Sequence, residues 1–427
     1  MKRKLFYNLR MKFLHISDVH LGCDRYGIEN AEKDFFDAFN DLIQRYALGG
    51  KVDFILIAGD FFHKQQLTPQ TLNYAYAVLE QIRKEKIPVV IVEGNHDKKA
   101  PNQRFAWLQV LANWKFIHFL QPTVRDHENQ KEIIYEKWDE QKARGGYVDI
   151  GKARIFGSCW YGASINLVAP MLIEGIRKAR RDGAFHILLL HTDIEGQEKN
   201  FSTSLSRANL NMLREVIDYL ALGHVHKSYE EGDWIFNPGS LEATNIDETQ
   251  EKRGAWLIEV DDKNHIISKT FISEYKKRAF DRIEIRVSDC ITPENVHEMI
   301  EKTLESRDYS ETIVEVSLTG LLRFSNSSLD LKKIRDKVYE LTNAYHVKIK
   351  NKTISDSIDS LEPGERTNSS EIEERVIRKL ILADSRFRKD EDTIKRMINA
   401  TLTLKNMVLD EESPENIFNS LEAQLFN

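Results

Sequence analysis

Short apolar runs alternate with amphipathic helical patterns along the first two-thirds of the chain. The runs at residues 13–16, 54–57 and 89–92 are rich in Val, Ile, Leu and Phe, which indicates buried strands. Between them, residues 31–46 and 69–84 repeat apolar side chains at spacings of three and four, the pattern of an amphipathic helix. This β-α-β-α-β order predicts a sheet of buried strands with helices packed against it.

The same alternation continues as far as residue 272. Further strands are predicted at residues 153–156, at 186–190, near Leu220 and at 234–236. A hairpin is predicted over residues 255–272, because the polar turn Asp261-Asp262-Lys263-Asn264 separates two apolar runs. The segment 125–146 is strongly charged, and we expect it to form an excursion over the surface. These patterns together predict one large α/β domain over residues 11–275.

A second, smaller α/β pattern begins at Phe280. It consists of a strand at 283–287, a helix at 293–304, a strand at 312–318, a helix at 329–341 and a strand at 346–349. We therefore predict a small α/β domain over residues 279–350.

The last part of the chain changes character again. Residues 351–370 contain the polar run SDSIDSLEPGERTNSS and are predicted to form a linker. Beyond the linker, residues 371–427 carry three apolar stripes of the kind that short amphipathic helices present. These helices would either dock on a partner protein, the interpretation we favour, or pack against the chain's own domains.

Composition narrows the class of function. A hydrophobic fraction of 41% is enough for a globular core. The formal net charge of -6 would repel nucleic acid, so contact with DNA would require a local basic patch or bound cations. Cys23, Cys159 and Cys290 are far apart and lack metal-ligand spacing, which argues against a disulfide framework and favours the reducing cytoplasm.

The beginning of the chain, MKRKLFYNLRMKFLHI, is basic but lacks the apolar run of a signal peptide. No stretch approaches the roughly 18 apolar residues of a membrane span, so no membrane association is expected. Met11 directly precedes the first predicted strand, so we expect translation to begin there and residues 1–10 to be dispensable.

Five predicted strands end in turns that are rich in metal ligands. These turns are Asp18-Val19-His20, Gly59-Asp60, Gly94-Asn95-His96-Asp97, His191 and Gly223-His224-Val225-His226. Active sites of α/β proteins favour such positions, at the carboxyl ends of strands. Carboxylate, imidazole and amide groups together suit manganese, iron or zinc better than calcium. Because one centre needs only about four to six ligands, the set predicts two ions, with the Asp60 carboxylate bridging them.

Two of the motifs space their ligands two residues apart. On an extended strand, such residues point to the same side. We therefore expect Asp18 and His20 to reach one ion together, and His224 and His226 to present two imidazoles together.

Taken in order, DVH, GD, GNHD, the lone His191 and GHVH resemble the calcineurin-like metallophosphoesterase superfamily, over residues 11–240. The run GDFFH, with His63 three residues after Asp60, is similar to the nuclease subunit of SbcCD-type DNA repair complexes and to the meiotic-recombination nucleases of archaea and eukaryotes. The run PGSLEATNIDE after Trp234 also resembles that branch. The resemblance implies a four-layer α-β-β-α sandwich with a small α/β cap and C-terminal helices.

The resemblance also implies an assignment of ligands. One ion, expected to be Mn²⁺, would be held by Asp18, His20, Asp60 and His226. The second ion would be held by Asp60, Asn95, His191 and His224. Hydroxide bridging the ions would then attack a DNA phosphodiester in line with the departing sugar oxygen.

Three further side chains are candidate catalytic residues. His96 would protonate the leaving group or steady the phosphate, and Asp97 would orient His96. His63 is a second candidate for contact with the phosphate or the leaving group.

Simpler interpretations stand beside these. The ligand set could consist of turn and capping residues, His96 could merely bond to Asp97, and His63 could be a surface histidine at a helix start. Other histidines lie in strand patterns and are expected to be packed or partly exposed and not to bind metal, namely His15, His118 and His186. The aromatic pair Trp160 and Tyr161 fits the core better than the site. A basic group fits either a DNA contact or a solvated loop: Lys98, Lys99 and Arg104.

Three functions are compatible with the sequence. The leading one is a DNA exonuclease and single-strand endonuclease that works as a homodimer with an SbcC-type coiled-coil ATPase. The chain contains no G-x-x-x-x-G-K-[ST] loop, so the partner would hydrolyse the ATP. The resemblance implies that the helices near 31–46 and 67–85 contribute to the dimer. The alternatives are a phosphatase or cyclic-nucleotide phosphodiesterase of the same superfamily, and a metal-free scaffold subunit.

Overall fold

The computed structural model describes residues 10–101, 103–127, 130–197, 204–288, 290–304, 309–355, 369–383, 390–409 and 412–426. The chain forms two compact units. The first unit extends to Asp281 and also includes Tyr309–Glu315 and Ala344–His346. The second unit consists of Arg282–Asp308, Val316–Asn343 and Val347–Asn427. The sequence predicts a boundary between residues 275 and 279. The structure divides the chain differently, because two short pieces of the second α/β pattern, Tyr309–Glu315 and Ala344–His346, belong to the first unit.

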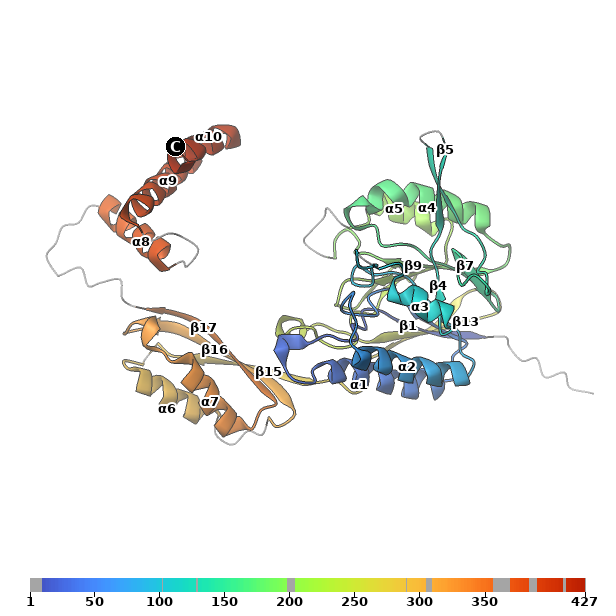
Figure 1. Cartoon of the computed structure of the whole chain (residues 1–427), viewed down its shortest axis with the longest axis horizontal. Coiled ribbons are helices and arrows are strands. Elements are labelled where there is room, and N and C mark those ends of the chain that lie inside the picture. The colour runs from blue at the N-terminus through green and yellow to red at the C-terminus, as the bar shows by residue number, and fades with distance from the viewer. Residues whose placement is uncertain are drawn as a thin grey trace, which may run out of the picture. The chain divides into compact units, whose positions relative to one another are not determined.

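Two six-stranded sheets form the centre of the first unit (Figure 1). The first sheet has the order β14-β13-β1-β2-β3-β4, and its strands are β14 (Ile266–Ile272), β13 (Ala255–Val260), β1 (Met11–Ile16), β2 (Phe54–Ile57), β3 (Val89–Ile91) and β4 (His118–Phe119). The second sheet has the order β11-β12-β10-β9-β8-β7, and its strands are β11 (Tyr229–Glu231), β12 (Ile235–Asn237), β10 (Tyr219–Gly223), β9 (Phe185–His191), β8 (Ala153–Phe156) and β7 (Tyr147–Ile150). The strands that precede the ligand-rich turns pair in parallel within each sheet, so their carboxyl ends share an edge.

Helices cover the outer face of each sheet, as Figure 1 shows. Helices α1 (Glu32–Leu42) and α2 (Pro69–Lys84) lie against the first sheet, and α1 continues into a π-helical segment at Ile43–Leu48. Helices α4 (Ile165–Ala179) and α5 (Arg207–Arg214) lie against the second sheet, and the short α3 (Trp107–Asn113) precedes β4. The predicted four-layer α-β-β-α sandwich is confirmed.

Strand β9 shows why the pattern of this fold is so apolar. All seven of its residues are buried. Ile187 and Leu189 belong to the core that includes the first sheet, whereas Leu188 and Leu190 belong to the core that includes α4 and α5. Successive side chains of a strand point to opposite faces, so a strand in the middle of four layers needs apolar residues at every position.

Helix α2 illustrates how the local sequence sets an element's bounds. Pro69 occupies its first turn, where the missing N–H costs nothing. The Thr68 hydroxyl accepts a hydrogen bond from the Thr71 backbone N–H at 3.1 Å and so caps the helix. Its buried residues include Ala75 and Val78, one turn apart on the face toward the sheet.

The predicted surface excursion at 125–146 is only partly correct. It begins within a hairpin of β5 (Thr123–His127) and β6 (Gln130–Ile134). Ile133 and Tyr135 are buried in the core that includes α4, and Trp138 is buried in the core of the first sheet. These apolar residues are interspersed with charged ones, so the average polarity of the segment does not indicate that it is anchored in the two cores.

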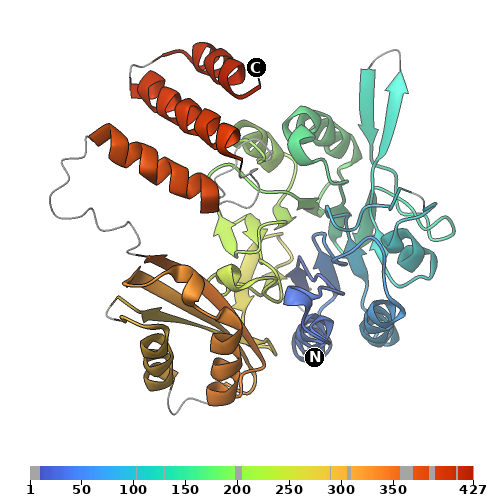
Figure 2. The same cartoon turned by 60° about the vertical axis from the view of Figure 1, so that its left-hand side comes forward.

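The second α/β pattern forms the predicted elements. These are β15 (Ala279–Arg286), α6 (Pro293–Leu304), β16 (Thr312–Leu322), α7 (Leu331–Thr342) and β17 (His346–Ser355). The sheet order is β15-β16-β17, and Figures 1 and 2 show α6 and α7 side by side on one face of it. Because β17 continues to Ser355, the predicted start of the linker at residue 351 is wrong.

The C-terminal part contains α8 (Ser369–Ala383), α9 (Glu391–Leu409) and α10 (Pro414–Phe426), as Figure 2 shows. A small core joins α8 to α9 through Ile381, Ile394 and Ile398. Large apolar side chains remain exposed on all three helices, among them Leu380 at 67% and Phe418 at 65%. Residues 356–368 of the predicted linker lie outside the described residues.

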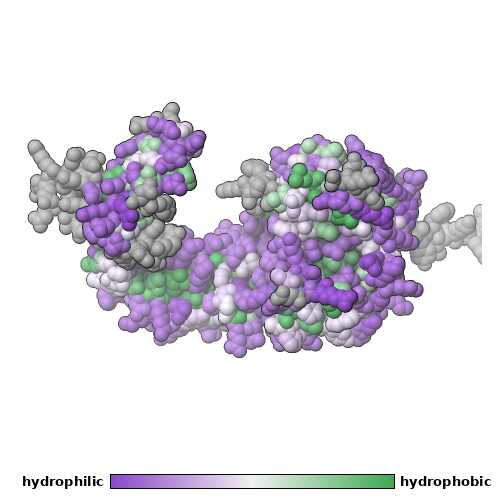
Figure 3. Space-filling view, turned by 45° about the horizontal axis from the view of Figure 1, so that its top comes forward, coloured by the Kyte–Doolittle hydropathy of each residue, from purple (hydrophilic) through white to green (hydrophobic). Residues whose placement is uncertain are grey.

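The visible face in Figure 3 is mainly hydrophilic, with apolar residues scattered between charged ones. Charged residues make up 30% of the chain, which accounts for this appearance. Within the described ranges, the model has no helix with the length and apolar character that a membrane crossing requires.

Two leucines test the layered packing. Leu189 is fully buried in β9, whereas Leu167 of α4 is 78% exposed. We expect Leu189→Ala to lower the free energy of unfolding by about 2–5 kcal/mol, because it removes buried methyl groups and leaves a cavity. The control Leu167→Ala should change it by less than about 0.5 kcal/mol. Urea denaturation followed by tryptophan fluorescence measures both effects, since all six tryptophans belong to the first unit. Equal losses would contradict the layered arrangement.

Candidate metal centre

The ligand-rich turns of both sheets meet at the carboxyl ends of the strands. Asp18 and His20 follow β1, Asp60 follows β2, and Asn95 follows β3 in the first sheet. In the second sheet, His191 ends β9, and His224 and His226 follow β10. The structure therefore brings together all seven side chains that the sequence proposes as metal ligands, in two groups.

The first group surrounds His20. Its Nε2 atom lies 3.0 Å from Nε2 of His226. Asp18 Oδ1 lies 4.0 Å from the same His20 nitrogen and 3.7 Å from that of His226. Asp60 Oδ2 lies 3.9 Å from His20 Nε2. The four side chains are those that the family resemblance assigns to one ion.

The second group surrounds His191. Its Nε2 atom lies 3.3 Å from Asp60 Oδ2 and 3.1 Å from Asn95 Oδ1. His224 Nδ1 lies 3.1 Å from the same Asn95 oxygen. With Asp60, these side chains are those that the family resemblance assigns to the other ion, and Asp60 Oδ2 is close to both groups.

These distances fit divalent ions. Ligands about 2.1 Å from a shared ion lie roughly 3.0–3.5 Å from one another, which matches the closest nitrogen and oxygen separations in both groups. Two imidazole nitrogens at 3.0 Å need a proton or a cation between them, because two lone pairs repel. The mixed carboxylate, imidazole and amide donors match the preferences of manganese, iron and zinc.

The backbone of the ligand turns corrects one sequence expectation. Strand β1 ends at Ile16, and Asp18 and His20 have φ angles of 49° and 50°, so the D-x-H motif is not extended. Asp60 and His224 are also left-handed, with φ of 49° and 91°. Such non-glycine residues cost about 1–3 kcal/mol each and persist only where the surroundings hold them.

Hydrogen bonds between two neighbouring turns hold this backbone. The N–H of Asp18 donates to the carbonyl of Gly59 at 3.1 Å. The N–H of His20 donates to the carbonyl of Asp60 at 3.0 Å. Asp18 and His20 thus share a site because the turn after β1 is bonded to the turn after β2, rather than because a strand alternates its side chains.

Two glycines of the motifs are required by close packing. Gly59 has a φ of +88°, and a Cβ atom there would overlap the His191 ring. A Cβ atom at Gly94 would overlap the Asp60 carboxyl group. The glycines in GD and GNHD therefore let the backbone approach the ligands of the neighbouring strands.

Asp97 does not orient His96 as the sequence analysis expects. Its buried carboxylate accepts backbone hydrogen bonds from Phe61 at 3.2 Å, Phe62 at 3.0 Å and Gly94 at 3.1 Å. Burial, followed by the nearby Asp60, raises the pKa of Asp97 to about 7. Asp97 therefore ties the turn after β2 to the turn after β3.

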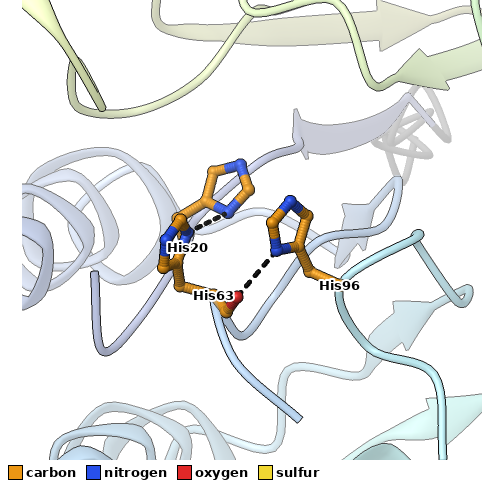
Figure 4. A group of neighbouring side chains, drawn as sticks. All are labelled: His20, His63 and His96. Carbon is orange, nitrogen blue, oxygen red and sulfur yellow. Dashed lines mark hydrogen bonds between the residues drawn. The ribbon is translucent and has the colours of Figure 1, made fainter. Parts of the chain in front are cut away.

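His96 is held by other groups. Its backbone N–H donates to Asp60 Oδ1 at 2.9 Å. Its ring Nδ1 lies 2.7 Å from the backbone carbonyl of His63, as Figure 4 shows. A carbonyl oxygen can only accept, so Nδ1 carries a proton, and Nε2 is the nitrogen available for proton exchange.

His63 is half-buried beside a metal ligand rather than exposed at a helix start. Its Nδ1 lies 3.3 Å from Nδ1 of His20, and its ring stacks on His96 at a centroid distance of 5.0 Å (Figure 4). Burial, followed by the nearby His96, lowers the pKa of His63 to about 4. A neutral His63 in this position contacts the nitrogen of His20 that faces away from the other ligands.

Histidines outside the motifs pack within the fold. His15 is buried between the two sheets and contacts the Tyr219 hydroxyl at 2.9 Å and the Leu222 carbonyl at 3.1 Å. His186 is buried beside Asp218, and the half-buried His118 contacts Glu140. The expectation that they pack rather than bind metal agrees with these contacts.

The aromatic and basic residues near the site differ in how far they are buried. Trp160 and Tyr161 are only partly buried. Lys98 Nζ lies 3.9 Å from the centre of the Trp160 ring, in cation–π contact. Lys99 and Arg104 are exposed, as in a solvated loop.

Glu248 is a neighbour of the site that the sequence reasoning missed. Its Oε1 lies 3.1 Å from Nδ1 of the candidate ligand His226. The residue belongs to the run PGSLEATNIDE, whose family resemblance gives no role to its glutamates. No spacing rule connects it to the GHVH motif, because the contact forms through a loop.

Electrostatics couple Asp60 to His191. Burial alone would lower the pKa of His191, but Asp60 at 3.3 Å outweighs it and raises this pKa to about 9. Burial likewise opposes ionisation of Asp60, yet its pKa is lowered by His191. In the metal-free protein the pair is therefore an imidazolium and a carboxylate at neutral pH.

Comparison with known proteins agrees with this centre. Residues 11–228, half of the chain, match the family model for calcineurin-like phosphoesterases, and the chain belongs to this family. Members of such a family are metal-dependent phosphoesterases, the enzyme class to which the site corresponds.

Two archaeal relatives are named for DNA repair. The chain is 32% identical over 249 residues to the DNA double-strand break repair protein Mre11 of Archaeoglobus fulgidus, covering 56% of this chain and 52% of that protein. It is 25% identical over 285 residues to the protein of the same name from Aeropyrum pernix, covering 65% and 64%. The chain thus spans about half to two-thirds of the length of these relatives.

A solved structure, the calcineurin-like phosphoesterase YfkN from Bacillus subtilis, is 14% identical with a TM-score of 0.39. The match covers 62% of this chain and 90% of that one.

Metal binding should depend on pH through His191. An ion must displace the proton that Asp60 holds on this ring, so below about pH 9 binding should release a proton. We expect the apparent affinity for Mn²⁺ to rise between about pH 6.5 and 8.5, by as much as tenfold per pH unit. Titration calorimetry in two buffers of different ionisation enthalpy measures both the affinity and the released proton. An affinity independent of pH would contradict the His191–Asp60 pairing.

Proposed function

We propose that this chain is a two-metal DNA phosphodiesterase that processes DNA ends. The observation that carries the proposal is the position of the Asp60 carboxylate between two groups of ligands. Its Oδ2 lies 3.3 Å from His191 Nε2 and 3.9 Å from His20 Nε2. A carboxylate between two sites lowers the repulsion of two dications held roughly 3.5–4 Å apart.

The ligand set supports Mn²⁺ as the ion, because manganese accepts carboxylate, imidazole and amide donors together. When bound, two such ions supply positive charge for a phosphate and acidify water at neutral pH. Asp60 and Asp18 contribute negative charge that keeps the ions in place. The remaining chemical task is to provide a proton for the departing sugar oxygen.

His96 is the side chain suited to that task. Its Nδ1 proton is held by the His63 carbonyl at 2.7 Å, so a second proton on Nε2 is the one that can be donated. The bond from its backbone N–H to Asp60 fixes its distance from the ligand groups. We propose His96 as the general acid and His63 as the residue that orients both His96 and His20.

DNA as the substrate is supported by the similarity to archaeal proteins named for DNA double-strand break repair. By resemblance, the activities would be exonuclease and single-strand endonuclease. A net charge of -6 would repel DNA, but bound cations would offset this repulsion locally, because they present positive charge where the substrate phosphate must lie.

The gathering of all seven ligands argues against a metal-free scaffold. The second candidate function is a phosphatase or cyclic-nucleotide phosphodiesterase of the same family. Assays with Mn²⁺ on plasmid DNA, single-stranded DNA and small esters distinguish this function from a nuclease. Cleavage of small esters alone would exclude the nuclease.

We further propose a coiled-coil ATPase of the SbcC type as the partner. The exposed apolar side chains of α8, α9 and α10 support a docking role, among them Leu380, Val408 and Phe418. Homodimerisation through α1 and α2 is proposed from the resemblance, and Tyr76 of α2 is 48% exposed. The scattered cysteines favour a reducing compartment, the cytoplasm.

Removing the proposed bridge tests the function. We expect Asp60→Asn to lower Mn²⁺-dependent cleavage of DNA by more than about 100-fold, because loss of even an outer partner of a ligand costs about 10- to 100-fold. The matched control is Asp182→Asn, an exposed residue that precedes β9 at the end opposite to His191, and this variant should keep full activity. Circular dichroism verifies that both variants are folded. Undiminished cleavage by Asp60→Asn would contradict the proposal.

The role of His96 is tested with two leaving groups. We expect His96→Asn to slow cleavage of DNA by about 10²–10⁴-fold, the usual contribution of a general acid. The same variant should lose far less activity on bis(p-nitrophenyl) phosphate, whose leaving group departs without a proton. Equal losses on both substrates would indicate that His96 does not act as the acid.

A further inference from the structure

Glu248 lies directly behind one of the candidate metal ligands. It ends the short 3-10 helix Ile246–Glu248, in the loop that follows β12. Its Oε1 is 3.1 Å from His226 Nδ1, while Nε2 of the same ring faces His20 at 3.0 Å. The imidazole of His226 is thus placed between a carboxylate on one side and the ligand group on the other.

We propose that Glu248 is a positioning residue for the ion held by Asp18, His20, Asp60 and His226. This inference rests on the metal centre of the proposed function. A carboxylate that accepts the Nδ1 proton of a histidine fixes the ring's tautomer and orientation and makes the other nitrogen a stronger ligand. The consequence here is that the lone pair of His226 Nε2 is directed at the ligand group.

The carboxylate is itself held in place by its own loop. Thr244 donates from its backbone N–H at 2.9 Å and from its hydroxyl at 2.6 Å. The amide of Asn245 donates at 2.6 Å. On the far side, the buried guanidinium of Arg253 lies 3.5 Å from Glu248 Oε2. With these donors and this cation around it, Glu248 is a fixed, ionised acceptor.

The other candidate ligands have different outer partners. His191 Nδ1 donates to the backbone carbonyl of Ala58 at 2.8 Å. His20 Nδ1 faces the ring of His63. Of the three candidate ligands His20, His191 and His226, it is therefore His226 whose outer nitrogen meets a carboxylate that is not itself a proposed ligand. Loss of Glu248 should weaken one ion and spare the one held by His191, Asn95 and His224.

A purely structural role for Glu248 makes a different prediction. If the carboxylate served only to close the loop at 244–248, then removing another of the loop's hydrogen bonds would have the same effect. Thr244→Val removes the hydroxyl bond to Glu248 but leaves the contact between Glu248 and His226. It is therefore the matched control for Glu248→Ala.

The test is titration of the whole chain, freed of metal, with Mn²⁺, by calorimetry and by electron paramagnetic resonance of the free ion. We expect Glu248→Ala to lower the affinity for one of two ions by about 10- to 100-fold and to leave the other within about threefold. Glu248→Gln should show a smaller loss, because its amide oxygen still accepts the Nδ1 proton without the negative charge. Thr244→Val should lower the affinity far less than Glu248→Ala does, because the backbone N–H of Thr244 and the amide of Asn245 still hold the carboxylate.

Cobalt provides a spectroscopic check. The visible absorption of Co²⁺ in the weakened site should shift more in Glu248→Gln than in Thr244→Val, which keeps the carboxylate beside His226. Unchanged affinities in both Glu248 variants, or an equal loss in Thr244→Val, would overturn the assignment. If the unmodified chain binds two ions but cleaves no DNA, the proposed nuclease fails while the role of Glu248 stands. If it cleaves DNA and the Glu248 variants bind both ions normally, only the role of Glu248 fails.

Discussion

The Asp60 carboxylate is the point on which the rest of this structure depends. It follows a strand of one sheet, yet its Oδ2 contacts His191 of the other sheet at 3.3 Å, and its Oδ1 accepts the backbone N–H of His96 at 2.9 Å. Concentrated negative charge in a buried position is unfavourable unless cations compensate it. In the metal-free protein the protonated His191 does so, and two divalent ions would do so in the proposed enzyme.

The fold supports this charge by constraining the backbone around it. Asp18, His20 and Asp60 adopt left-handed conformations that are uncommon for non-glycine residues, and bonds between the turns after β1 and β2 hold them there. Asp97 joins a third turn to this pair through three backbone N–H groups. The four layers of helices and sheets fix the strands, and the strands fix these turns. Rigid scaffolding of this kind is what places ligands from distant parts of a sequence within bonding distance.

The sequence predicts what is local or repeated. The strands at 54–57 and 89–91 are recognisable because burial on both faces demands continuous apolar runs, and the order of the motifs indicates which turns carry ligands. Its failures concern contacts made across the chain. Three features depend on long-range hydrogen bonds, which leave no periodic pattern in the sequence. They are the left-handed backbone of the D-x-H motif, the hydrogen bonds of Asp97 to neighbouring turns, and the contact of Glu248 with His226.

The most direct test of whether two ions share the Asp60 carboxylate is a magnetic measurement. Electron paramagnetic resonance of the chain loaded with Mn²⁺ reports whether bound ions interact, because ions that share a bridging ligand at roughly 3.5–4 Å couple their spins. We expect two ions per chain and a spin-coupled signal that is lost in Asp60→Asn. A single bound ion, or two ions with the spectrum of isolated Mn²⁺, would contradict it.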